Sequence, residues 1–98
     1  MYLLEIEPRA LEEIQQAIDY YDEQQPGLGL KFLTALEKEF SILIDKPKFQ
    51  IRYATVRCLK IKRYPFMVHF SIENEIVRVH AVLHTSLNPK NYWIKNKK

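Results

Sequence analysis

The chain has 98 residues, of which 47% are hydrophobic and 28% are charged, and its formal net charge is +3. This length fits a single domain over residues 1–98 whose core needs no covalent staple, and the lone Cys58 is expected to be a buried, inert thiol in a reducing compartment. No apolar run approaches the roughly 20 residues of a membrane span and no signal peptide is recognisable, so we expect a cytoplasmic protein whose modest positive charge permits an anionic partner.

The first half of the chain predicts a strand and then two helices. Tyr2 to Ile6 form a short β-prone segment, and Pro8 suits the first turn of a helix because its missing N–H is not needed there. In the segment that follows, apolar residues recur at three-and-four spacing and define one helix face. The members of this face are Leu11, Ile14, Ile18 and Tyr21. Pro26-Gly27 is a strong turn signal that separates this helix from the next.

A second amphipathic helix is expected from about Leu28 to Asp45, because Pro47 disfavours helix at the residue before it. Its apolar stripe consists of Phe32, Leu33, Leu36, Phe40, Leu43 and Ile44. Two amphipathic helices joined by a short break form an antiparallel hairpin, and we expect both stripes to pack in the core. The acidic clusters Glu12-Glu13 and Glu37-Glu39 are expected on exposed helix faces.

The second half predicts three strands. Val56 to Tyr64 alternates between apolar and polar residues, Pro65 interrupts the pattern, and Phe66 to Ile72 continues it as far as a turn at Glu73-Asn74-Glu75. The last strand is expected to place Val77, Val79, Ala81 and Leu83 on the apolar face, with Arg78, His80, Val82 and His84 opposite. The predicted fold class is α+β, with the order β-α-α-β-β-β and a helical hairpin packed on one face of a twisted antiparallel sheet.

The candidate functional residues gather on the polar face of this sheet, which carries cations and histidines but no carboxylate. They are Lys60, Lys62, His69, Arg78 and His80, with His84 at the rim. Cleavage of RNA through the 2′-hydroxyl needs a base, an acid and cations, and histidine titrates in the right range. His80 and His84 are poor mutual partners, because four strand positions separate them by about 13 Å. The alternative is a solvated sheet face without a catalytic role.

The turn before the last strand decides which polar residues are neighbours. A two-residue turn at Glu73-Asn74 sets His69 near Arg78, whereas a four-residue turn from Glu73 to Ile76 sets His69 opposite His80, about 5 Å apart. The second register also aligns the apolar positions and is preferred for that reason. The apolar pairs are Ile72 with Val77 and Phe70 with Val79.

No cofactor and no metal are predicted. One cysteine and widely spaced histidines give no zinc pattern, and two glycines exclude a glycine-rich phosphate loop. Ser41, Ser71 and Ser86 lie in no nucleophile elbow.

Several stretches, taken in order, resemble those of the RelE/ParE toxin superfamily and together cover nearly the whole chain. They are Ala10 to Tyr21, Pro26-Gly27-Leu28-Gly29 with Phe32-Leu33, Leu43 to Pro47, Arg57 with Lys60 to Phe66, and Ala81 to His84 followed by Pro89 and Trp93. The Tyr64-Pro65-Phe66 and Ala81-Val82-Leu83-His84 pieces are typical of the ParE-like branch. The resemblance implies a bacterial toxin of a type II toxin–antitoxin pair, of the kind called plasmid stabilisation systems, which is neutralised by a cognate antitoxin protein in a heteromeric complex.

The resemblance also bears on the target. Lys60-Ile61-Lys62 is similar to the paired lysines of the RelE-like ribonucleases. Met67, however, lies where these ribonucleases tend to have an arginine, and Leu87 lies where an arginine is common across the superfamily. The ParE-like branch is associated with poisoning of DNA gyrase. We therefore expect a non-enzymatic toxin that binds a replication target such as DNA gyrase. One alternative is a RelE-like ribonuclease that cleaves mRNA on the ribosome or free, and another is an inactive toxin-fold protein that only binds its partner. The catalytic candidates of the ribonuclease alternative are Lys60, Lys62, Arg78, His80 and His84.

Overall fold

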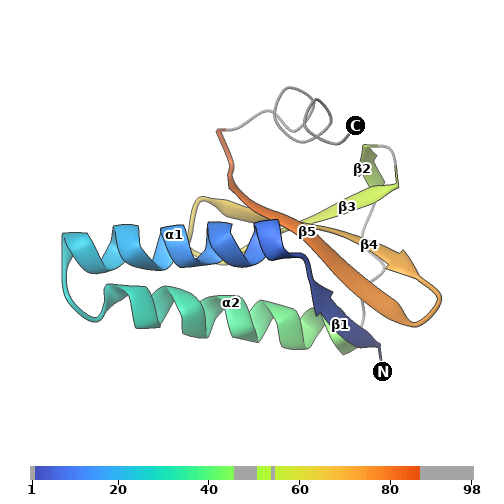
Figure 1. The fold of residues 1–98 in the computed structure, drawn as a ribbon, viewed down its shortest axis with the longest axis horizontal. Helices are drawn as coiled ribbons and strands as arrows, with labels where there is room; N and C mark the ends of the chain where they lie inside the picture. The colour runs from blue at the N-terminus through green and yellow to red at the C-terminus, as the bar shows by residue number, and fades with distance from the viewer. Residues whose placement is uncertain (1, 46–50, 54, 87–98) are drawn as a thin grey trace.

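The computed structural model describes residues 2–45, 51–53 and 55–86, and its elements follow the predicted order (Figure 1). They are β1 (Leu3–Ile6), α1 (Pro8–Gln24), α2 (Leu28–Asp45), β2 (Ile51–Tyr53), β3 (Val56–Lys60), β4 (Phe66–Glu73) and β5 (Ile76–His84). The helices form an antiparallel hairpin on one face of the sheet (Figure 1). The predicted α+β fold class is thereby confirmed. Within the described ranges, no helix is long and apolar enough to cross a membrane.

The sheet is mixed, with the strand order β1-β5-β4-β3-β2. β1 forms one edge and pairs with β5 in parallel, from Leu3 opposite Ile76 to Ile6 opposite Val79, while the other neighbouring strands are antiparallel. The parallel edge departs from the predicted antiparallel sheet. A parallel pair of strands needs a long connection. Here the helical hairpin and three strands separate β1 from β5 in the sequence. No local sequence pattern therefore predicts the pairing. The edge strand β2 is not predicted either, since three residues are too few for a periodic signal.

The hydrophobic core lies between the hairpin and the sheet. On α2, the buried members of the predicted stripe are Phe32, Leu36, Phe40 and Leu43. On α1, the buried residues are Ala10, Ile14 and Ala17. Leu11 is 52% exposed, so its prediction as a core residue is wrong. α1 packs against both α2 and β5, and the small alanines suit a helix between two close neighbours, whereas a hydrophobicity pattern gives more weight to the larger leucine.

A glycine allows the close approach of the two helices near their connection. A Cβ atom on Gly29 would lie 2.7 Å from the carbonyl oxygen of Ile18 and 2.8 Å from the carboxyl group of Asp22. The backbone N–H of Gly29 donates a hydrogen bond to Asp22 Oδ1 at 2.7 Å. Gly27, two residues earlier, has a φ of 95°, which a glycine adopts without steric cost. The Pro26-Gly27-Leu28-Gly29 stretch thus fixes the geometry of the hairpin.

A β-bulge interrupts the pairing of β4 and β5. The preferred register is confirmed on one side of it: the pairs are Ile72 with Val77 and Phe70 with Val79. Beyond the shift between His69 and Phe70, His69 lies opposite Ala81. The predicted pairing of His69 with His80 is therefore wrong, because His80 is the extra residue on the bulged strand.

The bulge also reverses which residues at the end of β5 face the helices. Val82 joins the core cluster under the helices, whereas Ala81 and Leu83 are buried outside that cluster. The predicted faces are thus correct as far as His80 and wrong after it, because one extra residue reverses the alternation.

Two glutamates tie the helical hairpin to the sheet. Glu13 on α1 accepts the backbone N–H of Val82 at 2.8 Å, and Glu39 on α2 accepts that of Lys62 at 3.2 Å. Glu39 is only 8% exposed and Glu13 is half-buried. The expectation that both acidic clusters lie on exposed faces is therefore wrong for these two members. Each carboxylate pairs with a backbone donor at an irregular point of the sheet, which a sequence pattern does not reveal.

Candidate functional site

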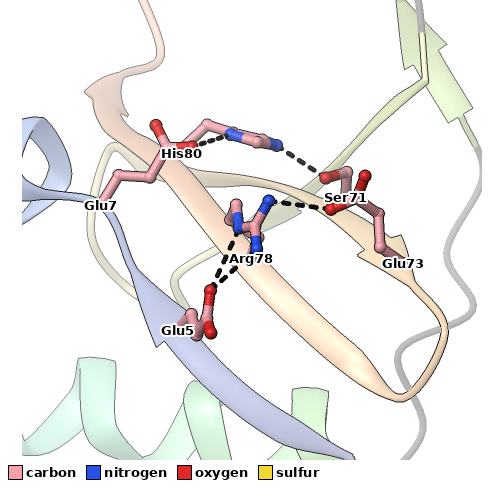
Figure 2. A network of polar contacts seen from close by, with 6 residues as sticks. All are labelled: Glu5, Glu7, Ser71, Glu73, Arg78 and His80. Carbon is pink, nitrogen blue, oxygen red and sulfur yellow. Dashed lines mark hydrogen bonds and ion pairs between the residues drawn. The ribbon is translucent and has the colours of Figure 1, made fainter.

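The polar face of the sheet carries an arginine held by two carboxylates (Figure 2). Arg78 on β5 donates to Glu5 Oε1 on β1 through Nε at 3.2 Å and Nη2 at 2.9 Å, and to Glu73 Oε1 on β4 through Nη1 at 2.8 Å. The hydrogen bond and the charge of Glu5, followed by the charge of Glu73, raise the pKa of Arg78. Three of the donors of the guanidinium group are thereby engaged before any ligand arrives.

A second hydrogen-bonded network, centred on His80, lies beside the Arg78 ion pairs (Figure 2). His80 Nδ1 lies 2.8 Å from Glu7 Oε2, and His80 Nε2 lies 2.7 Å from Ser71 Oγ. In a neutral ring with these partners, Nδ1–H donates to the carboxylate and Nε2 accepts the hydroxyl proton. His80 and Ser71 are 7% and 8% exposed. This hydrogen-bonded network therefore joins the β1–α1 junction to β5 and β4 in a position largely shielded from solvent.

His69 lies on the same face and is also buried. Its Nδ1 is 3.3 Å from Cys58 Sγ, and its side chain is 3% exposed. Burial, and then the electrostatic effects of His80 and Arg9, lower the pKa of His69 to about 4. His69 is therefore neutral near pH 7. The expectation of a buried thiol at Cys58 is confirmed.

The expectation that this face lacks carboxylates is wrong. Glu5 and Glu7 reach it from the N-terminal segment, and Glu73 reaches it from the end of β4 (Figure 2). The physical reason is the parallel pairing of β1 beside β5, which places residues more than 70 positions apart in direct contact. The face is an internally neutralised network rather than an open array of cations.

The two lysines of the Lys60-Ile61-Lys62 stretch separate at the end of β3. Lys60 is exposed, and its Nζ lies 3.4 Å from the carbonyl oxygen of Ile61. β3 ends there rather than at Tyr64 as predicted, because a tight turn follows, in which the N–H of Tyr64 bonds the carbonyl of Ile61 at 3.1 Å. Lys62, in this turn, lines a cleft beside α2. A departure from regular strand geometry thus breaks up the predicted lysine pair.

His84 lies at the exposed end of β5, as predicted. The bulge turns it to the helix side, where its ring meets the edge of Phe66 with centroids 5.4 Å apart. Its Nδ1 accepts the backbone N–H of Ser86 at 3.1 Å, which leaves the ring proton on Nε2. His84 and His80 are therefore on opposite sides of the sheet and do not form one site.

An apolar cleft surrounds His84 between α1 and the ends of β4 and β5. Two adjoining hollows of about 200 and 350 Å³ share Tyr20, Phe66 and His84 among their lining residues. Tyr20 is 54% exposed, which is unusual for a large aromatic side chain. Neither Tyr20 nor Phe66 is predicted as a site residue, because Tyr20 lies outside the predicted apolar face of α1 and the alternation of β4 places Phe66 on its apolar face.

Met67 and Leu87 are the two positions that depart from the ribonuclease pattern. Met67 is half-buried on β4 and lies opposite Leu83 on β5. Leu87 lies outside the described residues, as do Pro89 and Trp93. Within the described ranges, no group of three His, Cys, Asp or Glu residues is placed to hold a metal ion.

The sequence matches the family model described as "ParE toxin of type II toxin-antitoxin system, parDE" over residues 4–89. The chain belongs to this family. It is a ParE/RelE-type toxin of a toxin–antitoxin system, in agreement with the resemblance seen in its sequence. A search of the curated proteins finds no match to this toxin.

Solved structures share the fold of the toxin at low sequence identity. A chain of the chromosomal ParDE toxin–antitoxin system from P. aeruginosa is 18% identical, with a TM-score of 0.75, and the match covers 86% of this chain and 96% of that one. The intact E. coli RelBE toxin–antitoxin complex gives 19% identity, a TM-score of 0.63, and coverage of 84% and 94%. The isolated E. coli RelE toxin gives 16% identity, a TM-score of 0.64, and coverage of 99% and 98%.

Proposed function

We propose that this toxin acts by binding a replication target, with DNA gyrase as the first candidate, and that a cognate antitoxin protein neutralises it. The observation that carries the proposal is the dispersal of the ribonuclease candidates. Arg78 is engaged by Glu5 and Glu73, and His80 is buried between Glu7 and Ser71. Catalysis of RNA cleavage needs an acid, a base and cations around one phosphate.

The remaining candidates also diverge. His84 lies on the helix side of the sheet and Lys62 lines the cleft beside α2. His69, a candidate for target binding but not for catalysis, is buried, and because its pKa is lowered to about 4 it is neutral near pH 7. Lys60 is exposed, yet no candidate histidine is bonded to it. This distribution favours a toxin that acts through a contact surface over one that acts through a catalytic set.

The apolar cleft at Tyr20, Phe66 and His84 is the contact surface that we assign to the antitoxin. Its exposed aromatic and apolar walls suit a helical or extended segment that inserts apolar side chains between the hairpin and the sheet. Acidic groups of the same partner would face the positively charged toxin, whose net charge is +3. Tyrosine is also among the residues that most often dominate binding energy at interfaces.

Co-purification with the protein encoded beside this gene tests the antitoxin assignment. Tyr20→Ala removes the exposed ring of the cleft and should release the partner during size-exclusion chromatography. Leu30→Ala is the matched control, because Leu30 is 67% exposed at the start of α2 and lines none of the hollows around His84. Equal retention of the partner by both variants would move the antitoxin to another surface.

Induction of the toxin in cells tests the target assignment. We expect replication to stall and a DNA-damage response to follow, while messenger RNA stays intact. Early cleavage of messenger RNA at codon-spaced positions, abolished by His84→Ala, would contradict the proposal and favour the ribonuclease. If neither response occurs although the antitoxin binds, the chain is an inactive, partner-binding member of its family.

A further inference from the structure

A second cleft, of about 450 Å³, lies on the other helix of the hairpin. α2 forms one wall, and the turn between β3 and β4 forms the other. α2 contributes Lys31 and Lys38, and the turn contributes Lys62 and Arg63, so four cations line a single cleft. The volume falls within the range of small-molecule sites in proteins, which is roughly 300–1,000 Å³. We call this region the basic cleft.

The cations of the basic cleft have no partner among the described residues. Within the described part of the chain, none of the four side chains forms an ion pair or a hydrogen bond. Arg78 and Arg9, by contrast, are each paired with glutamate. The basic cleft contains one carboxylate, Glu39, and that group accepts the backbone N–H of Lys62. An excess of unmatched positive charge in a concave surface attracts anions.

The backbone at Arg63 points to the same conclusion. Arg63 has a φ of 73°, in the left-handed region that costs an ordinary residue roughly 1–2 kcal/mol. Among the described residues, the other non-glycine residue with positive φ is Asn74, with a φ of 57°, and asparagine tolerates this conformation well. The turn would thus accept glycine or asparagine at position 63 more easily than arginine. Strain of this kind clusters at ligand-binding positions.

We propose that the basic cleft binds a compact ligand that carries two or more phosphate groups on a partly apolar body, the chemistry of a nucleoside di- or triphosphate. Lys31 and Lys38 are two helical turns apart, about 10 Å along α2, so they can contact different groups of one extended ligand. Arg63 supplies the planar donor set that matches phosphate oxygens. Ile42, 44% exposed, and Tyr64 offer the apolar part of the lining.

This site is separate from the antitoxin cleft and does not depend on the proposed target. Its other candidate occupants are a nucleic-acid backbone and an acidic peptide. The four cations gather around one cleft between one α-helix and one turn, an arrangement that suits a compact ligand better than an extended polymer. The observations therefore favour a small polyphosphate.

Calorimetric titration of the 98-residue chain at low salt tests the proposal, with ATP as the probe. We expect ATP to bind, pyrophosphate to compete with it, and adenosine to give no signal. Lys38→Ala and Arg63→Gly should each weaken ATP binding roughly tenfold, the loss of one charge-assisted hydrogen bond. Arg63→Gly should not lower the thermal midpoint, because glycine relieves the left-handed backbone.

Two matched variants control for charge and for the turn residue. Lys60→Ala removes an equal charge outside the basic cleft, and Asn74→Gly changes the other left-handed position. Both should bind ATP within about twofold of the unmodified chain, below the loss of a single hydrogen bond. An equal loss of ATP affinity in Lys60→Ala would overturn the proposal, because it would show that ATP is attracted non-specifically by positive charge. Absence of ATP binding, or binding only of a thymidine oligonucleotide or of polyglutamate, would also overturn it.

Discussion

The polar face of the sheet and the basic cleft contain the same kinds of residue but differ in how their charges are used. On the polar face, Arg78 is bonded to carboxylates of β1 and β4, and His80 is bonded to a carboxylate at the β1–α1 junction. In the basic cleft, Lys38 and Arg63 have no such partners within the described part of the chain. A cluster of cations therefore marks a binding site only where the fold has not already supplied the anions.

The largest effect should come from acid, through the buried histidine of the polar face. The pKa of His69 is lowered to about 4, chiefly by burial and then by the electrostatic effects of His80 and Arg9. The unfolded chain takes up a proton near pH 6.5 and the folded chain does not, so stability falls as the pH drops from about 6.5 toward 4. We expect the free energy of unfolding to fall by roughly 2 kcal/mol between pH 7 and pH 5. Most carboxylates titrate below this pH interval.

Urea unfolding at the two pH values measures this loss. His69→Leu fills a similar volume without a titrating group and should remove most of the pH dependence. His84→Ala changes an exposed histidine and should retain it. A pH dependence that is unchanged in His69→Leu would show that another group causes the acid sensitivity.

A smaller effect is expected from the hydrogen-bonded chain through His80. His80→Ala leaves Glu7 and Ser71 without their ring partner in a largely buried position. The expected cost is about 1.5 kcal/mol in the free energy of unfolding, typical of buried polar groups that lose a partner. Denaturant titration measures it, and His84→Ala should stay within about 0.5 kcal/mol, as is usual for a surface substitution. Equal stability of both variants would mean that the polar face is less constrained than its contacts indicate.

The smallest effect is expected from substitutions of single cations, one that is paired with carboxylates and one that is not. Arg78→Ala breaks two exposed ion pairs and should lower the thermal midpoint slightly at low salt, with the difference disappearing as salt screens the pairs. Lys38→Ala should leave the midpoint unchanged or raise it slightly, because it reduces repulsion within the basic cleft. A midpoint that falls by the same amount in both variants, with the same dependence on salt, would contradict the distinction between the two regions.

The sequence by itself determined the elements that depend on local chemistry. Both helices, the turn at Pro26-Gly27, the hairpin packing and the α2 stripe follow from periodicity and from the limits that proline and glycine place on the backbone. The apolar pairing of Ile72 with Val77 was also predictable, because a strand places alternate residues on one face. The order of the elements and the resemblance to known toxins together gave the family.

Only the tertiary structure decided how the polar residues are used. The parallel pairing of β1 with β5 brings Glu5 and Glu7 to the polar face, and the bulge at His80 sends His84 to the helix side. The turn after Lys60 carries Lys62 and Arg63 to α2. Each of these depends on contacts between distant segments or on one extra residue in a strand. Local periodicity predicts neither the contacts between distant segments nor the extra residue. It indicates only which residues of one segment share a face, not which segments pack together.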